Sequence, residues 1–348
     1  MSKHSSTIDN KSKSPLITVV IPAHNAEKFI KRAVQSIENQ SFEDWELIIV
    51  ENGSSDGTYS FCKQFLIDSR IRLVSSETGV SNARNKGIEL SNGRWICFLD
   101  ADDYLLNDAL NLFIKEAKDD IDLIVGEYDH NKIASVAPAV ISNSEFLELS
   151  LCNPTQYCNV TGCLFSNAMI RRLNLCFKRE LTHAEDSVFL IEFIVAGARV
   201  KLLNHALYHV YYNPDSAVRA GSTSNVEAYA NSINTIKGIL TVYQYNIEPA
   251  LDAFILNQVL ILMVHDIYAG VKDLKSYKKA CRKFDQMLMN KTFVESFEPE
   301  AIKKLSRKKQ VCLFFIEKHC RFITFLIVRI RQVGNARKAE QEMIPKKI

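Results

Sequence analysis

The sequence predicts an α/β protein in which a mostly parallel sheet is followed by a helical region. Two observations support this prediction. From Leu16 onward, short runs rich in Val, Ile and Leu alternate with segments whose apolar residues recur at helical spacing, as expected for successive βα units. From about residue 225 the strand-like runs disappear, and helical periodicity dominates, as in 255–268 and 277–289. We therefore expect a loose polar tail over 1–14, an α/β domain over 15–225 and a helical region over 226–348.

The order of elements follows from the same patterns. Near-continuous apolar runs typical of strands buried on both faces occupy 16–21, 46–50, 71–74, 95–99 and 122–126. Helical spacing occupies 26–39, the segment through Phe61, Phe65 and Leu66, then 81–90 and 107–118. Farther along, we expect helices near 144–151, over 163–173 and over 185–197, and a strand within 200–212.

The composition excludes several classes of protein. The chain has 348 residues, of which 47% are hydrophobic and 24% charged, so it is neither disordered nor collagen-like. Nine scattered cysteines without a C-x-x-C pair indicate neither a disulfide framework nor a zinc site, and they suit a reducing compartment. The polar segment 1–14 lacks the apolar run of a secretory signal. The apolar window 311–328 is interrupted by Glu317, Lys318, His319 and Arg321, so we expect no transmembrane segment.

Polar loops follow three of the predicted strands. They contain Pro22-Ala23-His24-Asn25, Glu51-Asn52-Gly53-Ser54-Ser55-Asp56 and Asp100-Ala101-Asp102-Asp103. Doubly wound sheets bind ligands at the carboxyl ends of their strands, so these loops should converge on one rim. Three carboxylates within four residues repel one another unless a cation separates them, and their oxygens suit Mg²⁺ or Mn²⁺. An acidic helix N-terminus is the alternative interpretation of this tetrapeptide.

Four motifs in order are more specific than any one of them. They are Val19-Val20-Ile21-Pro22-Ala23-His24-Asn25, Ile48-Ile49-Val50-Glu51-Asn52-Gly53-Ser54-Ser55-Asp56, Gly79-Val80-Ser81-Asn82-Ala83-Arg84-Asn85 and Phe98-Leu99-Asp100-Ala101-Asp102-Asp103. Their sequence and spacing resemble those of family 2 inverting glycosyltransferases with the GT-A fold, a Rossmann-like nucleotide-sugar-binding domain. The resemblance continues through Gly162, Glu185-Asp186, Tyr208 and Ser216, and covers about residues 15–220.

The resemblance implies roles for individual residues in binding a nucleotide sugar. It places Pro22, Ala23 and Asn25 beside the nucleotide, and it matches Glu51 and Asn52 to the family's acidic pair that faces the base and ribose. This chain departs from the usual Asp-Asp there, although an Asn amide oxygen can still accept from a uracil or thymine N–H. Arg84 matches an arginine beside the diphosphate. Asp100, Ala101 and Asp102 match the metal and nucleotide motif, in which Asp102 and Asp100 are the metal ligands for Mn²⁺ or Mg²⁺.

The pair Glu185-Asp186 opens a predicted helix. From the residues alone, an acidic pair there can simply interact with the helix dipole. In the family the second acid is the general base, so the resemblance implies that Asp186 takes the acceptor proton and that Glu185 orients the acceptor or the base. His183, His209 and His24 are more often structural than ligands, and for His209 a contact with phosphate or metal is the minority interpretation.

We therefore expect an inverting hexosyl- or N-acetylhexosaminyltransferase that uses a nucleotide sugar. UDP is the expected nucleoside diphosphate of this donor. The acceptor expected from the resemblance is a hydroxyl of a growing or lipid-linked bacterial cell-surface glycan: lipopolysaccharide core, O-antigen or capsule. A catalytically impaired nucleotide-sugar-binding or scaffold protein is the alternative. Nucleic-acid binding is not expected, because no aromatic platform accompanies the basic residues.

Basic residues are concentrated at the end of the chain. Residues 301–348 contain thirteen Lys/Arg and three Glu, although the whole chain has a net charge of only +3. A basic amphipathic segment over about 303–333 can lie on an anionic membrane, or it can pack as core with its lysines directed outward. We therefore expect a cytoplasmic protein, and the first interpretation adds peripheral attachment to the cytoplasmic face of the inner membrane.

Overall fold

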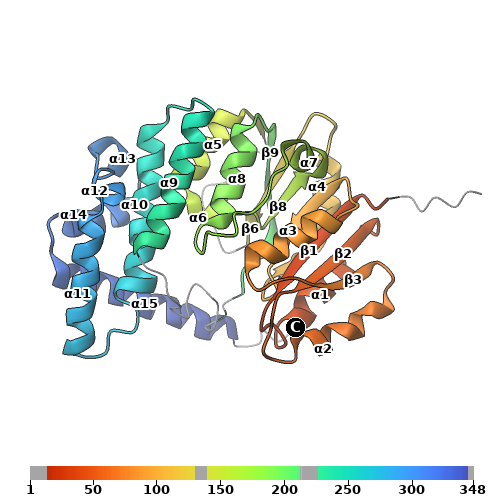
Figure 1. The fold of residues 1–348 in the computed structure, drawn as a ribbon, viewed down its shortest axis with the longest axis horizontal. Coiled ribbons are helices and arrows are strands. Elements are labelled where there is room, and N and C mark those ends of the chain that lie inside the picture. Colours follow the sequence, from red (N-terminus) through yellow and green to blue (C-terminus); the bar gives the residue numbers. More distant parts are fainter. Residues whose placement is uncertain (1–13, 130–138, 212, 214–225, 344–348) are drawn as a thin grey trace, which may run out of the picture.

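A computed structural model describes residues 14–129, 139–211, 213 and 226–343 of the chain (Figure 1). Its centre is a nine-stranded mixed sheet with the strand order β3-β2-β1-β4-β8-β6-β9-β5, in which β7 also pairs with β9. The strands are β1 (Ile17–Ala23), β2 (Trp45–Glu51), β3 (Ile71–Ser75), β4 (Trp95–Phe98), β5 (Tyr104–Leu105), β6 (Leu123–Tyr128), β7 (Ala139–Ile141), β8 (Cys163–Ser166) and β9 (Val200–His209).

The sheet is parallel in its first half and mixed in its second half. β1 pairs in parallel with β2 and β4, and β2 pairs in parallel with β3. Because β8 runs antiparallel to both β4 and β6, the second half departs from the parallel arrangement. The last strand, β9, is parallel to β6 and antiparallel to β5 and β7.

Helices cover both faces of the sheet. They are α1 (Ile30–Glu38), α2 (Thr58–Cys62) with a 3₁₀ turn (Lys63–Ile67), α3 (Val80–Leu90), α4 (Ala109–Glu116), α5 (Asn143–Cys152), α6 (Pro154–Tyr157), α7 (Asn167–Leu173) and α8 (Glu185–Val195). Residues of β1 alternate between two cores: Val19 and Ile21 join the core on the side of α1 and α4, whereas Val20 joins the core on the side of α3 and α8. Burial on both faces explains why the strand sequences are continuously apolar.

The last part of the described chain is helical and shares the second of these cores. Its helices are α9 (Val226–Val242), α10 (Glu248–Leu262) with a π-helical turn (Met263–Ile267), α11 (Leu274–Met289), α12 (Lys291–Val294), α13 (Pro299–Lys303), α14 (Arg307–Glu317) and α15 (Arg321–Met343). α10 packs on α5, and α9 packs on α8. The helical stretch Glu248–Ile267 is long and apolar enough to span a membrane, but 72% of its most apolar window is buried inside the protein, as in the central helix of a core.

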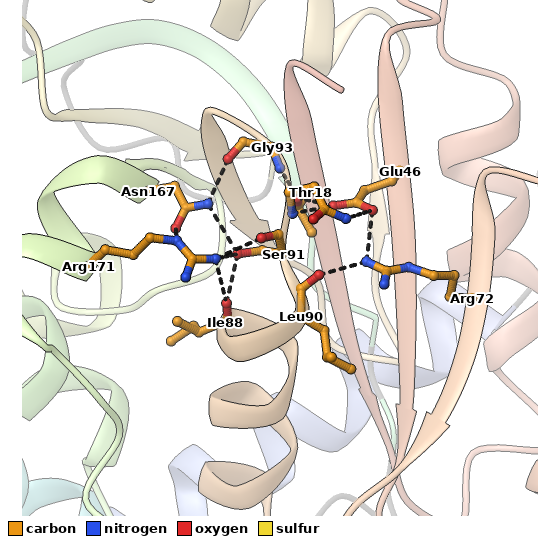
Figure 2. A network of polar contacts seen from close by, with 10 residues as sticks. Thr18, Glu46, Arg72, Ile88, Leu90, Ser91, Gly93, Asn167 and Arg171 are labelled. Carbon is orange, nitrogen blue, oxygen red and sulfur yellow. Dashed lines mark hydrogen bonds and ion pairs between the residues drawn. The ribbon is translucent and has the colours of Figure 1, made fainter. Parts of the chain in front are cut away.

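A polar network joins the amino-terminal ends of β1, β2 and β3, at the edge of the sheet opposite the polar loops (Figure 2). The Thr18 hydroxyl donates to Glu46 Oε1 at 2.6 Å and accepts from the Gly93 N–H at 2.8 Å. Arg72 donates to Glu46 Oε2 at 2.8 Å and to the Leu90 carbonyl oxygen at 2.7 Å. These contacts connect β1, β2 and β3 to the α3–β4 turn, and so fix where α3 ends.

Two sequence-based expectations about individual elements need correction. The helix expected over 163–173 is wrong in its first part: Cys163–Ser166 forms β8, and α7 begins at Asn167. Buried apolar residues occur on both sides of the boundary between β8 and α7, which hides that boundary in the sequence. Leu164 and Phe165 of β8 face the two cores, and Met169 and Ile170 of α7 are buried as well. The basic segment is not one helix, since His319 (φ 55°) separates α14 from α15. The division at residue 225 stays a prediction.

Candidate active site

The loops after β1 and β2 are hydrogen-bonded to each other. Asn25, with φ 49°, donates its N–H to Ser54 Oγ at 3.0 Å and accepts the Ser55 N–H on Oδ1 at 2.8 Å. The backbone N–H of Asn52 donates to the Ala23 carbonyl oxygen at 3.1 Å. Pro22 and Ala23 are the last residues of β1 and line up with Val50 and Glu51 of β2. The two predicted nucleotide loops therefore form one rigid rim.

Glu51 and Asn52 have different environments. A Glu51 carboxylate oxygen accepts the Ser54 N–H at 2.5 Å, so this acid shapes the loop. The Asn52 side chain is 3% exposed, and its Oδ1 is buried without a hydrogen-bond partner. A buried acceptor without a donor costs free energy unless a ligand supplies one. Asn52 Oδ1 is therefore available to an N–H of a bound molecule.

The acidic loop after β4 is anchored by residues at the end of β9 and just after it. The Asp100 N–H donates to the Tyr208 hydroxyl at 3.2 Å, and that hydroxyl donates to Asp103 Oδ2 at 2.8 Å. Asn213 Nδ2 donates to Asp102 Oδ2 at 2.9 Å. Burial, with the nearby charges of Asp100 and Asp102, raises the pKa of Asp103 to about 8. The loop thus carries two accessible carboxylates above a third that is buried.

Arg84 joins the acidic loop to the acidic pair of α8. Its side chain is only 5% exposed, and its two terminal nitrogens lie 3.1 Å from Asp100 Oδ1 and 2.9 Å from Glu185 Oε1. The guanidinium carbon lies 5.2 Å from the centre of the Phe177 ring. Arg84 Nε is buried without a partner. One cation therefore connects motifs that are separated by about a hundred residues of chain.

Asp186 is a partly buried carboxylate with a raised pKa. Burial and the neighbouring charge of Glu185 raise its pKa to about 7, although Arg84 and the Ser187 N–H act in the opposite direction. Ser187 N–H lies 2.7 Å from Asp186 Oδ1. A carboxylate with a pKa near neutrality can accept a proton more readily than an ordinary aspartate.

The donor set at the acidic loop fits a divalent cation. Carboxylate oxygens suit Mg²⁺ and Mn²⁺. After burial, the charges of Asp100 and Asp102 also raise the pKa of Asp103, and a cation would relieve the repulsion among these carboxylates. Among the residues that the structure describes, no group of three His, Cys, Asp or Glu side chains forms a complete metal site. Asp100 and Asp102 could thus contribute ligands that a substrate completes.

Three contacts of the acidic loop had no clear signal in the sequence. The Tyr211 N–H donates to Asp103 Oδ1 at 2.8 Å, and Asn213 donates to Asp102. The Arg32 guanidinium contacts the Asp102 carbonyl oxygen.

His209 stacks on Tyr104 with ring centres 4.4 Å apart and contacts the Asp129 carboxylate. Ser216 lies outside the described residues.

Known proteins resemble this chain in sequence and fold. The family model named "Glycosyl transferase family 2" matches residues 18–175. Residues 18–175 are a family 2 glycosyltransferase domain. The uncharacterized glycosyltransferase EpsJ of Bacillus subtilis (strain 168) is 28% identical over 215 residues, which cover 58% of this chain and 62% of EpsJ. The UDP-Glc:alpha-D-GlcNAc-diphosphoundecaprenol beta-1,3-glucosyltransferase WfgD of Escherichia coli is 32% identical over 179 residues, which cover 49% of this chain and 66% of WfgD.

The chain thus spans less than two thirds of the length of these two relatives. A crystal structure of S. aureus TarS in complex with UDP-GlcNAc has a TM-score of 0.61 at 16% identity, and the match covers 92% of each chain. The expected GT-A fold, with its glycosyltransferase domain followed by a helical region, is therefore confirmed.

Proposed function

We propose that this protein is an inverting glycosyltransferase that moves a sugar from a UDP-linked donor to a hydroxyl of a cell-surface glycan. The observation that carries the proposal is the buried Arg84, which holds the acidic loop beside the Glu185-Asp186 pair within a family 2 domain. A donor site and a proton acceptor are then fixed relative to each other, as a single displacement requires.

The donor would lie across the rim formed by the first two loops and the acidic loop. Asn52 Oδ1, buried without a donor, suits the N–H of a uracil ring. Asp100 and Asp102 would hold Mn²⁺ or Mg²⁺ at the diphosphate, with Ala101 beside the nucleotide. When bound, the cation supplies positive charge at the leaving diphosphate. WfgD and the TarS complex, through the donors in their names, support a UDP-sugar.

The chemical step assigned to this chain is proton transfer to Asp186. As the acceptor oxygen forms its bond to the anomeric carbon, the bond from that carbon to the diphosphate oxygen breaks. The acceptor's proton moves to the Asp186 carboxylate, and the nucleoside diphosphate departs with the electron pair. One displacement inverts the anomeric carbon. Glu185, held by Arg84, would orient the acceptor and the base relative to each other.

The proposed acceptor is a lipid-linked glycan, and the proposed location is the cytoplasm. WfgD acts on a diphosphoundecaprenol-linked sugar according to its name, which supports a lipid-linked glycan as acceptor. We propose that the protein works in the cytoplasm, where nucleotide sugars are available, on intermediates of lipopolysaccharide, O-antigen or capsule.

The test is the pair of variants Asp186→Asn and Asp119→Asn. Asp186→Asn should abolish glycosyl transfer while binding of a UDP-sugar in the presence of Mn²⁺ stays within about two-fold, because the amide keeps the shape but accepts no proton. Asp119, whose side chain is 94% exposed, provides the control and should leave turnover unchanged. Nuclear magnetic resonance of the product should show the inverted anomer.

Undiminished turnover in Asp186→Asn would reject its role as base. Binding of UDP-sugars without transfer or donor hydrolysis by the wild-type protein would favour the alternative of a nucleotide-sugar-binding or scaffold protein.

A further inference from the structure

The outer side of α15 presents a stripe of exposed apolar side chains. Phe322 is 60% exposed, Ile323 40%, Leu326 44%, Ile330 74% and Val333 48%. At 3.6 residues per turn, these five positions fall within about a quarter of the helix circumference. We call these five side chains the α15 stripe. A stripe this continuous on a surface helix indicates contact with something apolar.

The opposite side of α15 is packed firmly on the protein. Thr324 and Val328 are buried at 0% and 2% exposure. Phe325 lies against Tyr268 and Tyr277, with ring centres 5.5 Å and 5.3 Å away. Because this inner side fixes the rotation of the helix, the stripe cannot turn inward without breaking these contacts.

The preceding helix extends the apolar surface. Val311 and Phe314 of α14 are 55% and 53% exposed and lie one turn apart. α14 and α15 are neighbours in the structure. Two helices therefore contribute exposed apolar side chains to the same end of the chain.

Basic side chains accompany this surface. The segment 307–333 contains seven Lys or Arg and a single acid, Glu317. Arg329 and Arg331 are exposed on α15; at about 100° per residue, Arg329 lies next to one edge of the stripe and Arg331 lies about 80° beyond the other edge. Arg307 and Lys308 are exposed at the start of α14. An apolar stripe flanked by cations complements an interface whose surface is anionic and whose interior is hydrocarbon.

α15 lies on the side of the molecule toward which β1 runs. Figure 1 shows it along the lower side, toward which β1 runs from the N-terminal end of the chain. The loop after β1 carries the proposed donor rim.

We propose that α14 and α15 form a peripheral membrane-binding surface, in which the α15 stripe inserts among lipid chains and the flanking arginines contact anionic headgroups. A second copy of this chain is a poorer partner, because the basic residues around the stripe would repel their counterparts across a two-fold interface. The inference concerns where the protein is held, and it does not depend on the proposed activity.

The test measures co-sedimentation of the full chain with vesicles. Vesicles of phosphatidylcholine with about one third phosphatidylglycerol should bind the protein, whereas vesicles of phosphatidylcholine alone should bind it much more weakly. The triple variant Leu326→Ser, Ile330→Ser, Val333→Ser should lose about ten-fold or more in binding. The double variant Arg329→Gln, Arg331→Gln should lose binding mainly at low salt.

The matched control changes exposed apolar residues elsewhere. Val242 and Met289 are 76% and 80% exposed, so Val242→Ser with Met289→Ser should leave vesicle binding unchanged. A Phe322→Trp variant gives a second readout that keeps the stripe apolar. The two native tryptophans, Trp45 and Trp95, are 2% exposed, so the added indole should dominate any blue shift on vesicle addition.

Three results with vesicles would overturn the proposal. They are a wild-type protein that ignores anionic vesicles, a folded triple variant that binds them as well as the wild type, and a Phe322→Trp variant without a blue shift. Sedimentation equilibrium completes the test: a dimer that the triple variant dissociates would assign the stripe to a second copy instead.

Discussion

Arg84 shows how one residue can organise a charged site. A guanidinium that is 5% exposed has lost most of its hydration, and it is retained because Asp100 and Glu185 each lie within hydrogen-bonding distance. Removing Arg84 would leave Asp100, Glu185 and Asp186 without their shared cation. We therefore interpret Arg84 as the electrostatic centre of the proposed site rather than as a surface arginine.

The pH dependence of activity should report on Asp186. Its pKa is raised to about 7, so the carboxylate is protonated below that pH and can act as a base only above it. We expect kcat/KM to rise about ten-fold per pH unit below pH 7 and to level off above it. Glu185→Gln removes a charge that raises this pKa, so the rising limb should move to lower pH. A limb that stays in place or moves upward would contradict the assignment.

The same raised pKa affects stability. The folded protein keeps a proton on Asp186 that the unfolded chain releases near its ordinary value of 3.8. The unfolded state therefore binds fewer protons between about pH 4 and 7, and this group lowers the free energy of unfolding as the pH rises through that window.

The sequence nominates residues for the site, but it does not predict their environments. Asp100 and Asp102 belong to a motif in the loop after β4, and Glu185 and Asp186 to an acidic pair that opens α8. The burial that shifts the pKa of Asp186 arises from elements far apart in the chain, and so does the contact of Asn213 with Asp102. Such long-range contacts leave no local pattern of spacing or composition.

At the scale of elements, the close packing of α3 on β1 positions Arg84. Gly87, one turn after Arg84, is buried, and a Cβ there would lie 2.2 Å from Val20 Cγ1 and 2.8 Å from Cγ2. Val20 is β-branched and completely buried, so it cannot rotate away. A glycine therefore sets the distance between helix and sheet.

Gly87→Ala and Gly238→Ala should have opposite effects on stability. Gly87→Ala forces α3 away from β1 and should cost about 1–3 kcal/mol of unfolding free energy. Gly238 lies within α9 with open space around its Cα, so alanine there should gain about 1 kcal/mol through helix propensity. Urea denaturation of both variants checks this. Equal free energies of unfolding for Gly87→Ala and wild type would show that this contact does not set the position of α3.

Long, apolar elements were predictable from sequence, and short ones were not. β1, β2 and β4 are buried on both faces, which leaves continuous runs of apolar residues. β5 has two residues and β7 has three, and each exists because it pairs with β9. The four residues of β8 carry no periodicity that separates them from α7, so only the pairing with β4 and β6 defines them as a strand.

At the scale of the whole molecule, the glycosyltransferase domain and the helical region share apolar core. One cluster of buried side chains runs from Val20 in the sheet to Val328 in α15. Phe146 and Leu147 of α5 belong to it together with Phe254 and Ile255 of α10, and all four side chains have no exposed surface. Helices on the two sides of residue 225 therefore depend on each other for burial.

This shared core leads to a prediction about cooperativity. The two tryptophans lie in β2 and β4, so their fluorescence reports on the sheet, whereas far-ultraviolet circular dichroism is dominated by the helices. We expect both signals to change at one temperature in the full chain. A fragment ending at residue 225 should expose the apolar faces of α5 and α8, and should therefore aggregate or lose fixed side-chain packing. A soluble fragment with its own cooperative transition, or two separate transitions in the full chain, would show instead that the helical region is an independently folded domain.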